Sequence, residues 1–104
     1  MTQIPNYPDR ERLAPIVVRI VGDRGLVQNI HQNIDNETVH ETAGEAARRL
    51  MAIELADWGR AEIEIRGEPV EPELIGYWRM LAREAIEYPD EFDRLVRSIE
   101  EAVA

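Results

Sequence analysis

The chain has 104 residues, a formal net charge of −9, twelve arginines, a single serine (Ser98), and neither lysine nor cysteine. These absences exclude Schiff-base chemistry, thiolate nucleophiles, disulfides and thiolate metal sites, so we expect a non-enzymatic protein without a cofactor. Nucleic acid and anionic membranes repel a polyanion, so we expect neither as a direct partner.

Residues 1–15 contain three of the six prolines and predict an extended arm ahead of a single α+β domain over residues 16–104. No apolar run approaches the roughly 20 residues that cross a bilayer. The N-terminus lacks a basic segment followed by an apolar one, so we expect no secretion signal and a cytoplasmic location.

The β-branched segment 16–21 predicts a strand. The alternation of side chains along a strand puts residues 16, 18 and 20 on one face and residues 17, 19 and 21 on the other. Because both faces carry apolar residues, we expect this strand to be central in its sheet, or one face to meet a partner. Residues 22–25, Gly-Asp-Arg-Gly, predict a turn.

Residues 26–34 are compatible with two structures. Leu26, Ile30 and Ile34 recur every four residues, which suits one face of a helix. All three also have even numbers, so in a strand they would point to the same face, which suits a strand that turns one face inward. We predict a second strand that forms a hairpin with the first.

A helix is predicted from Thr38 to Trp58, where Gly59 ends it. Thr38 and Glu41 have the spacing of a capping box, in which hydroxyl and carboxylate each accept a hydrogen bond from a backbone N–H. Glu54 interrupts the apolar residues near the end of this helix and is the best candidate for the desolvated carboxylate that general acid–base catalysis needs. It lies at the edge of the apolar stripe, however, where a snorkelling or ion-paired acid is common. The apolar stripe predicted to face the core comprises Val39, Ala43, Ala46, Ala47, Leu50 and Ile53.

Residues 61–66 alternate apolar and charged side chains and predict a strand with Ala61, Ile63 and Ile65 inward. The acidic stretch 68–72 predicts a stiff connector, after which Pro72 begins a helix that ends near residue 88. A last helix follows. Its apolar stripe comprises Phe92, Leu95, Val96, Ile99 and Val103.

This order predicts an α+β fold, with a small sheet of about three strands in ββαβ order, covered by helices and followed by two C-terminal helices. The opening order resembles a β-grasp arrangement by topology only. A chain of this length offers helices for one face of the sheet, and we expect the other face to be left open.

Glu37 and His40 have the Glu-x-x-His spacing that places two metal ligands on one face of a helix. Di-iron proteins use two such motifs with further glutamates, whereas this chain has one copy, in the predicted first turn. Interactions with the helix dipole and with solvent explain these residues more simply, and we expect His31 to be exposed or half-buried. A carboxylate–histidine metal enzyme is therefore the weakest alternative.

Tyr77 and Trp78 are adjacent on a predicted helix, about 100° apart around its axis, so they cannot both face the core. We expect Tyr77 to be partly exposed and to form an interaction surface with Arg79, since tyrosine and arginine are enriched in interface hot spots. Packing of Tyr77 on a neighbouring loop is the alternative.

We therefore predict a small, acidic, regulatory or accessory protein that binds another protein. The alternative is a mimic of nucleic acid that inhibits a basic partner through the acidic C-terminal third of the chain. We also predict a homodimer, because Arg19 alone separates Val17 from Val21 on the sheet face that the helices leave open.

Overall fold

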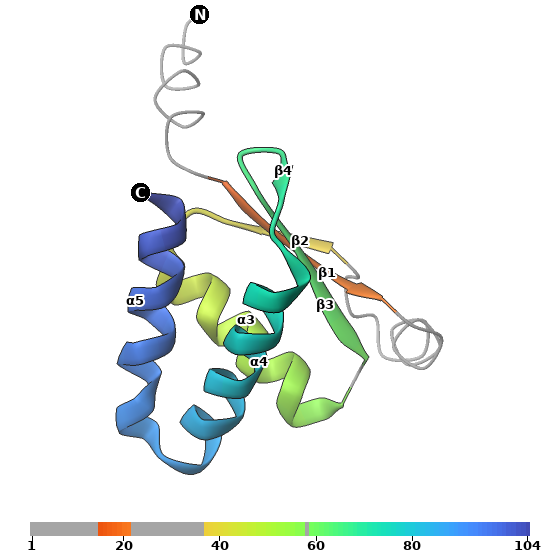
Figure 1. Ribbon diagram of the computed structural model, residues 1–104. Coiled ribbons are helices and arrows are strands. Elements are labelled where there is room, and N and C mark those ends of the chain that lie inside the picture. The colour runs from red at the N-terminus through yellow and green to blue at the C-terminus, as the bar shows by residue number, and fades with distance from the viewer. Residues whose placement is uncertain (1–14, 22–36, 58) are drawn as a thin grey trace, which may run out of the picture.

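The computed structural model describes residues 15–21, 37–57 and 59–104, and these residues form a sheet covered by helices (Figure 1). The strands are β1 (Ile16–Val21), β2 (Glu37–His40), β3 (Arg60–Ile65) and β4 (Glu68–Pro69). The helices are α3 (Ala43–Ala56), α4 (Pro72–Glu87) and α5 (Phe92–Val103), with a 3-10 turn, η1 (Pro89–Glu91), between the last two. The predicted α+β class and the two C-terminal helices are confirmed.

The described strands form one antiparallel sheet in the order β2-β1-β3-β4. β1 lies between β2 and β3, which confirms its prediction as a central strand. The short β4 was not predicted. It forms because Arg66 (φ 54°) and Gly67 (φ 81°) both take positive φ, as a two-residue hairpin turn requires. The stretch predicted as a connector therefore begins by pairing with β3.

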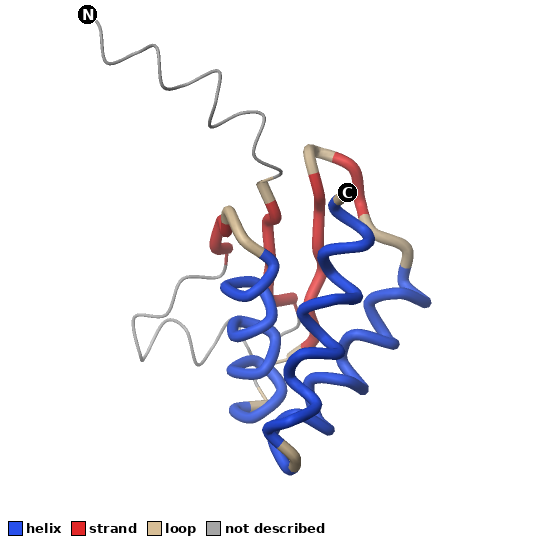
Figure 2. The backbone as a smooth tube through the Cα atoms, turned by 90° about the vertical axis from the view of Figure 1, so that its left-hand side faces the viewer, coloured by secondary structure: helices blue, strands red, loops and turns tan. Residues whose placement is uncertain are grey.

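The helices lie on one side of the sheet (Figure 2). α3 contacts β1, β2 and β3, α4 contacts β3, and α5 packs against α3 and α4. Every second residue of β1 and β3 is buried beneath this helical layer, as the alternation predicted. These residues are Ile16, Val18, Ile20, Ala61, Ile63 and Ile65.

One hydrophobic cluster joins the sheet to the helical layer. Trp78 of α4 is its largest fully buried side chain, with an exposed fraction of 0%. The indole Nε1–H of Trp78 donates a hydrogen bond of 2.8 Å to Ser98 Oγ on α5. The lone serine of the chain therefore satisfies the polar group of the largest core residue.

The N-cap of helix α3 lies four residues later than predicted, at Thr42 instead of Thr38. Thr38 lies in β2, and Val39 is exposed on that strand instead of facing the core. The N-cap is Thr42, whose hydroxyl accepts from the Glu45 N–H at 3.2 Å, while the Glu45 carboxylate accepts from the Glu41 N–H at 3.2 Å. The T-x-x-E spacing occurs twice in succession, and the second copy caps the helix. The rest of the predicted stripe is buried.

The end of α3 also differs from the prediction. The helix ends at Ala56, and Asp57 takes a left-handed conformation (φ 55°). Gly59 follows with φ 141°, and a Cβ atom there would lie 2.6 Å from the backbone oxygen of Val21. Glycine is therefore needed where the chain passes the end of β1 to enter β3, not to terminate the helix.

Some predictions fall outside the described residues. They concern the arm over 1–15 apart from Pro15, the turn over 22–25, the strand over 26–34, His31 and Trp58. The carbonyl of Pro15 accepts a hydrogen bond of 3.1 Å from the Arg66 amide, which joins the start of β1 to the β3–β4 turn. Across the described ranges, none of the helices combines the length and apolar character needed to cross a bilayer.

Candidate functional site

The side of the sheet away from the helices presents alternate residues of three strands, and we call it the outer face. Its members are Val17, Arg19, Val21, Glu37, Val39, Arg60, Glu62 and Glu64. The register of β1 and β2 places Val39 directly opposite Val17. Val17 and Val21, the predicted interaction residues of this strand, are half-buried, whereas Val39 is 62% exposed.

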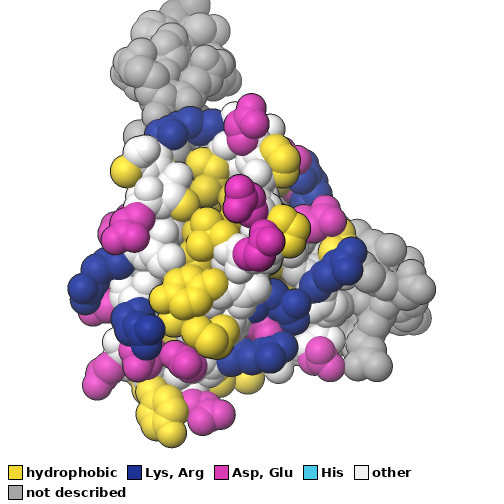
Figure 3. Space-filling view, viewed as in Figure 1, with side chains coloured by type: hydrophobic (Ala, Val, Ile, Leu, Met, Phe, Trp, Pro, Cys, Tyr) yellow, Lys and Arg dark blue, Asp and Glu magenta, His cyan; other side chains and the backbone are white. Residues whose placement is uncertain are grey.

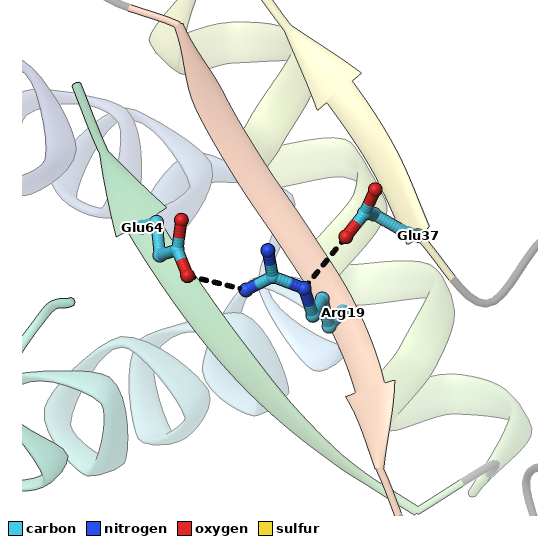
Figure 4. Close-up of polar contacts among 3 residues, drawn as sticks. All are labelled: Arg19, Glu37 and Glu64. Carbon is cyan, nitrogen blue, oxygen red and sulfur yellow. Dashed lines mark hydrogen bonds and ion pairs between the residues drawn. The ribbon is translucent and has the colours of Figure 1, made fainter. Parts of the chain in front are cut away.

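An ion-pair network around Arg19 occupies the centre of the outer face (Figure 4). Arg19 Nε donates to Glu37 Oε2 at 2.6 Å, and Arg19 Nη1 donates to Glu64 Oε2 at 2.7 Å. The hydrogen bond to Glu64, followed by that to Glu37, raises the pKa of Arg19 above its ordinary value. Arg19 therefore does not stand alone between the two valines, because the strands on both sides supply carboxylates.

The predicted Glu-x-x-His arrangement is wrong, because Glu37 and His40 lie in a strand instead of a helix. Three residues apart on a strand, they point to opposite faces. Glu37 pairs with Arg19, whereas His40 Nε2 lies 2.8 Å from Thr38 Oγ1. Burial lowers the pKa of His40, with Glu45 opposing that shift. No group of three potential metal ligands occurs among the described residues.

Large side chains are exposed along one side of α4. Tyr77 is 42% exposed and Met80 44%, and Tyr88, which follows the helix, is 63% exposed. Met80 and Tyr88 follow Tyr77 by three and eleven positions, and this spacing puts all three on the same side of the helix. We call Tyr77, Met80 and Tyr88 the α4 surface. Trp78 is buried, as expected for the neighbour of an exposed Tyr77. Figure 3 shows hydrophobic side chains between acidic and basic ones on the side where α4 and α5 face the viewer.

Tyr77 and Arg79 were predicted to form one surface, but the structure does not bring them together. Tyr77 hydrogen-bonds with Arg94 of α5. The hydrogen bond of Arg94 to Glu91 raises the pKa of Arg94 most, and the one to Tyr77 raises it further. Arg79 lies about 200° around the helix from Tyr77 and turns toward α3. The predicted exposure of Tyr77 is therefore confirmed, but its pairing with Arg79 is wrong.

Arg79 instead takes part in a link between α3 and α4. The Glu54 side chain is only 3% exposed, and its two carboxylate oxygens each accept a hydrogen bond of 2.7 Å. The donors are the Nε atoms of Arg79 and Arg83. The sequence is compatible with a snorkelling or an ion-paired acid at this position. The structure shows an ion-paired one, whose partners lie 25 and 29 residues further along the chain.

A cavity of about 590 Å³ lies between the β3–β4 hairpin and the first half of α4. Its lining includes the apolar residues Ile63, Val70 and Ile75, together with Gly76 and Arg79. The sequence does not predict this cavity, because its walls come from four separate elements, β1, β3, β4 and α4. The one indication in the sequence is Gly76, a glycine within a predicted helix.

Neither a protein-family model, nor a curated relative, nor a solved structure matches this chain, so its function has to be argued from the outer face, the α4 surface and the cavity.

Proposed function

We propose that this protein is a non-enzymatic accessory or regulatory protein that binds another protein through its α4 surface. The observation that carries the proposal is the exposure of Tyr77 and Met80 on α4 and of Tyr88 directly after it, while the opposite side of α4 is packed into the core. Tyrosine is enriched at the energetic centres of interfaces, and methionine adapts its shape to a partner.

The charges near this surface suggest what kind of partner binds there. The acidic residues of α4 and η1 are Glu73, Glu84, Glu87, Asp90 and Glu91. The arginines of the same elements, Arg79 and Arg83, are both paired with Glu54, and Arg94 of α5 offsets part of the acidic charge by pairing with Glu84 and Glu91. We therefore expect a partner with an apolar pocket surrounded by basic residues. The alternative, a mimic of nucleic acid, would depend on the acidic residues without the apolar centre.

We expect Tyr77→Ala to weaken partner binding by at least about 2 kcal/mol, or roughly 30-fold, because a central aromatic residue would leave its pocket. A photo-crosslinking residue at Met80 would first identify the partner. The dissociation constant of the purified pair would then be measured for each variant. Leu55→Ala is the control, since Leu55 is 71% exposed but lies on α3.

The same titrations distinguish the two kinds of partner contact. A nucleic-acid mimic loses affinity steeply as salt rises and responds little to Tyr77→Ala. The proposed contact depends on Tyr77 and loses less affinity with salt than a mimic does, because salt screens only the charges that surround its apolar centre. Unchanged affinity in the Tyr77→Ala variant would contradict the proposed surface.

We further propose that a second copy of the chain covers the outer face. This face has two arginines and three glutamates, so its charges nearly balance, in contrast to the acidic α4 and η1. Identical surfaces meet in a two-fold dimer, and a nearly balanced surface has the least charge repulsion. Val17, Val21 and Val39 supply apolar area around the Arg19 network.

We expect Val39→Glu to shift the protein from dimer to monomer without changing its helical circular dichroism. Val39 is 62% exposed, so a charge there is tolerated by the monomer but is buried at the interface. Val17→Glu and Val21→Glu should act in the same direction. Light scattering at tens of micromolar measures the mass, and Leu55→Glu is the matched control. A one-chain mass for the unaltered protein would rule out the dimer.

A further inference from the structure

The cavity between β3, β4 and α4 has the size and mixed lining of a small-molecule site. Its volume of about 590 Å³ lies within the range of sites that hold one small organic molecule. Ile63, Val70 and Ile75 give it an apolar wall, and charged side chains lie at its margins. Such sites combine apolar walls with a few directed polar groups, and the polar groups decide which ligand fits.

Gly76 leaves space in this cavity that the fold itself does not require. Glycine is among the least favourable residues inside a helix, and Gly76 lies within α4. A Cβ atom built at Gly76 would meet nothing within 4 Å, so no close packing demands a glycine there. Because Gly76 lines the cavity, a side chain at this position would add atoms at the cavity wall.

Arg79 provides a positioned cation at the same cavity. Glu54 holds the Nε atom of Arg79 at 2.7 Å, which fixes the guanidinium and leaves its Nη atoms as further donors. The same carboxylate also accepts from Arg83, so one negative charge is shared by two positive ones. The planar fork of an arginine matches the two oxygens of a carboxylate.

The open edge of β3 adds backbone groups to the cavity wall. The Val70 amide donates to the Ile63 carbonyl at 2.8 Å, so the hydrogen-bonding groups of Ile63 point toward β4. Ala61, two residues earlier, points its N–H and C=O to the same side. The pairing of β3 with β4 covers only Glu64 and Ile65, so on this side of β3, opposite to β1, no described strand lies beside Ala61.

The other charges around the cavity offset one another and leave Arg79 as the anchor. Glu64 is paired with Arg19 on the outer face. Arg60 and Glu62 lie two residues apart on that same face and carry opposite charges. The positive charge that remains at the cavity is that of Arg79 on α4.

We propose that this cavity binds a small carboxylic acid with an apolar body. The carboxylate lies against the Nη atoms of Arg79, and the apolar body lies along Ile63, Val70 and Ile75 and crosses α4 at Gly76. This site goes beyond the proposed protein partner and does not depend on it.

Octanoate is the probe, and 1-octanol of the same chain length is its uncharged control. In an amide NMR titration of the full chain, octanoate should shift Ala61, Ile75 and Gly76 saturably. We expect its dissociation constant to be at least tenfold lower than that of 1-octanol. No saturable shift at these residues, or equal affinity for the acid and the alcohol, would overturn the proposal.

The Gly76→Ala variant distinguishes an effect on ligand binding from an effect on the stability of the fold. It should raise the melting temperature, because alanine favours the helix, yet weaken octanoate binding at least tenfold. Gly44→Ala in α3 is the matched control, because a Cβ at Gly44 also meets nothing within 4 Å and Gly44 does not line the cavity. That variant should be stabilised without a change in binding. Undiminished octanoate binding by Gly76→Ala would contradict the site even if the fold is stabilised.

Discussion

Replacement of Trp78 by alanine is expected to lower the free energy of unfolding by about 3–5 kcal/mol. Trp78 is fully buried in the cluster that joins the sheet to the helices, so its removal leaves a cavity that its neighbours cannot fill. Domains of this size are stable by roughly 5–15 kcal/mol, so the variant should lose a large fraction of its stability.

Urea denaturation followed by far-ultraviolet circular dichroism measures this change. Tyr77→Ala is the matched control, because Tyr77 is the adjacent aromatic residue but is 42% exposed. We expect that variant to lose much less stability. Equal losses for the two variants would show that Trp78 does not hold the central position assigned to it.

The hydrogen bond of Trp78 gives this prediction a second part. Ser98→Ala should cost about 1–3 kcal/mol, because it leaves the indole N–H buried without an acceptor. Trp78→Phe removes the donor, so Ser98→Ala should cost less in that background. Additive effects of the two substitutions would contradict a direct interaction.

The sequence predicts best those elements whose apolar pattern is long and unambiguous. β1 begins and ends at the predicted residues, and β3 and α4 lie within one residue of their predicted starts. The start of α3 could not be predicted locally, because residues 38–41 and 42–45 both have the capping spacing. Pairing of Val39 with Val17 decides between them, and this pairing depends on the whole sheet.

The unpredicted β4 has a different cause. Its turn needs Arg66 at positive φ, which the sequence does not indicate because an arginine rarely takes that conformation. Pro69 also argues against a strand, since it cannot donate a backbone hydrogen bond. It is tolerated here because β4 is the edge strand of the described sheet.

Of the candidate sites, the sequence predicted the exposure of Tyr77 but not the residues that surround it. Helical periodicity is a local property, so it separates an exposed Tyr77 from a buried Trp78. The partners of Glu54 and Trp78 lie 20 or more residues away on other helices, where only tertiary packing brings them close. The cavity could not be predicted for the same reason.

The second large effect is expected at Glu54, where Glu54→Gln should lower the free energy of unfolding by about 1.5–3 kcal/mol. Glutamine has nearly the same shape, so packing is retained. It has no negative charge, and only one of its two terminal atoms can accept from the Nε atoms of Arg79 and Arg83. The loss should be smaller than for a fully buried ion pair, because the Arg83 side chain is 66% exposed and can be hydrated.

A double-mutant cycle that combines Glu54→Gln with Arg79→Gln or Arg83→Gln measures each interaction by urea denaturation. We expect the stronger coupling with Arg79, which is 30% exposed, since solvent screens that contact less than the one with Arg83. The coupling should also change little with salt, because the Glu54 carboxylate is only 3% exposed. A stability change below about 0.5 kcal/mol for Glu54→Gln would place it among ordinary surface substitutions and show that this carboxylate does not hold α3 to α4. The cycle therefore tests the contact that positions Arg79 without using any ligand.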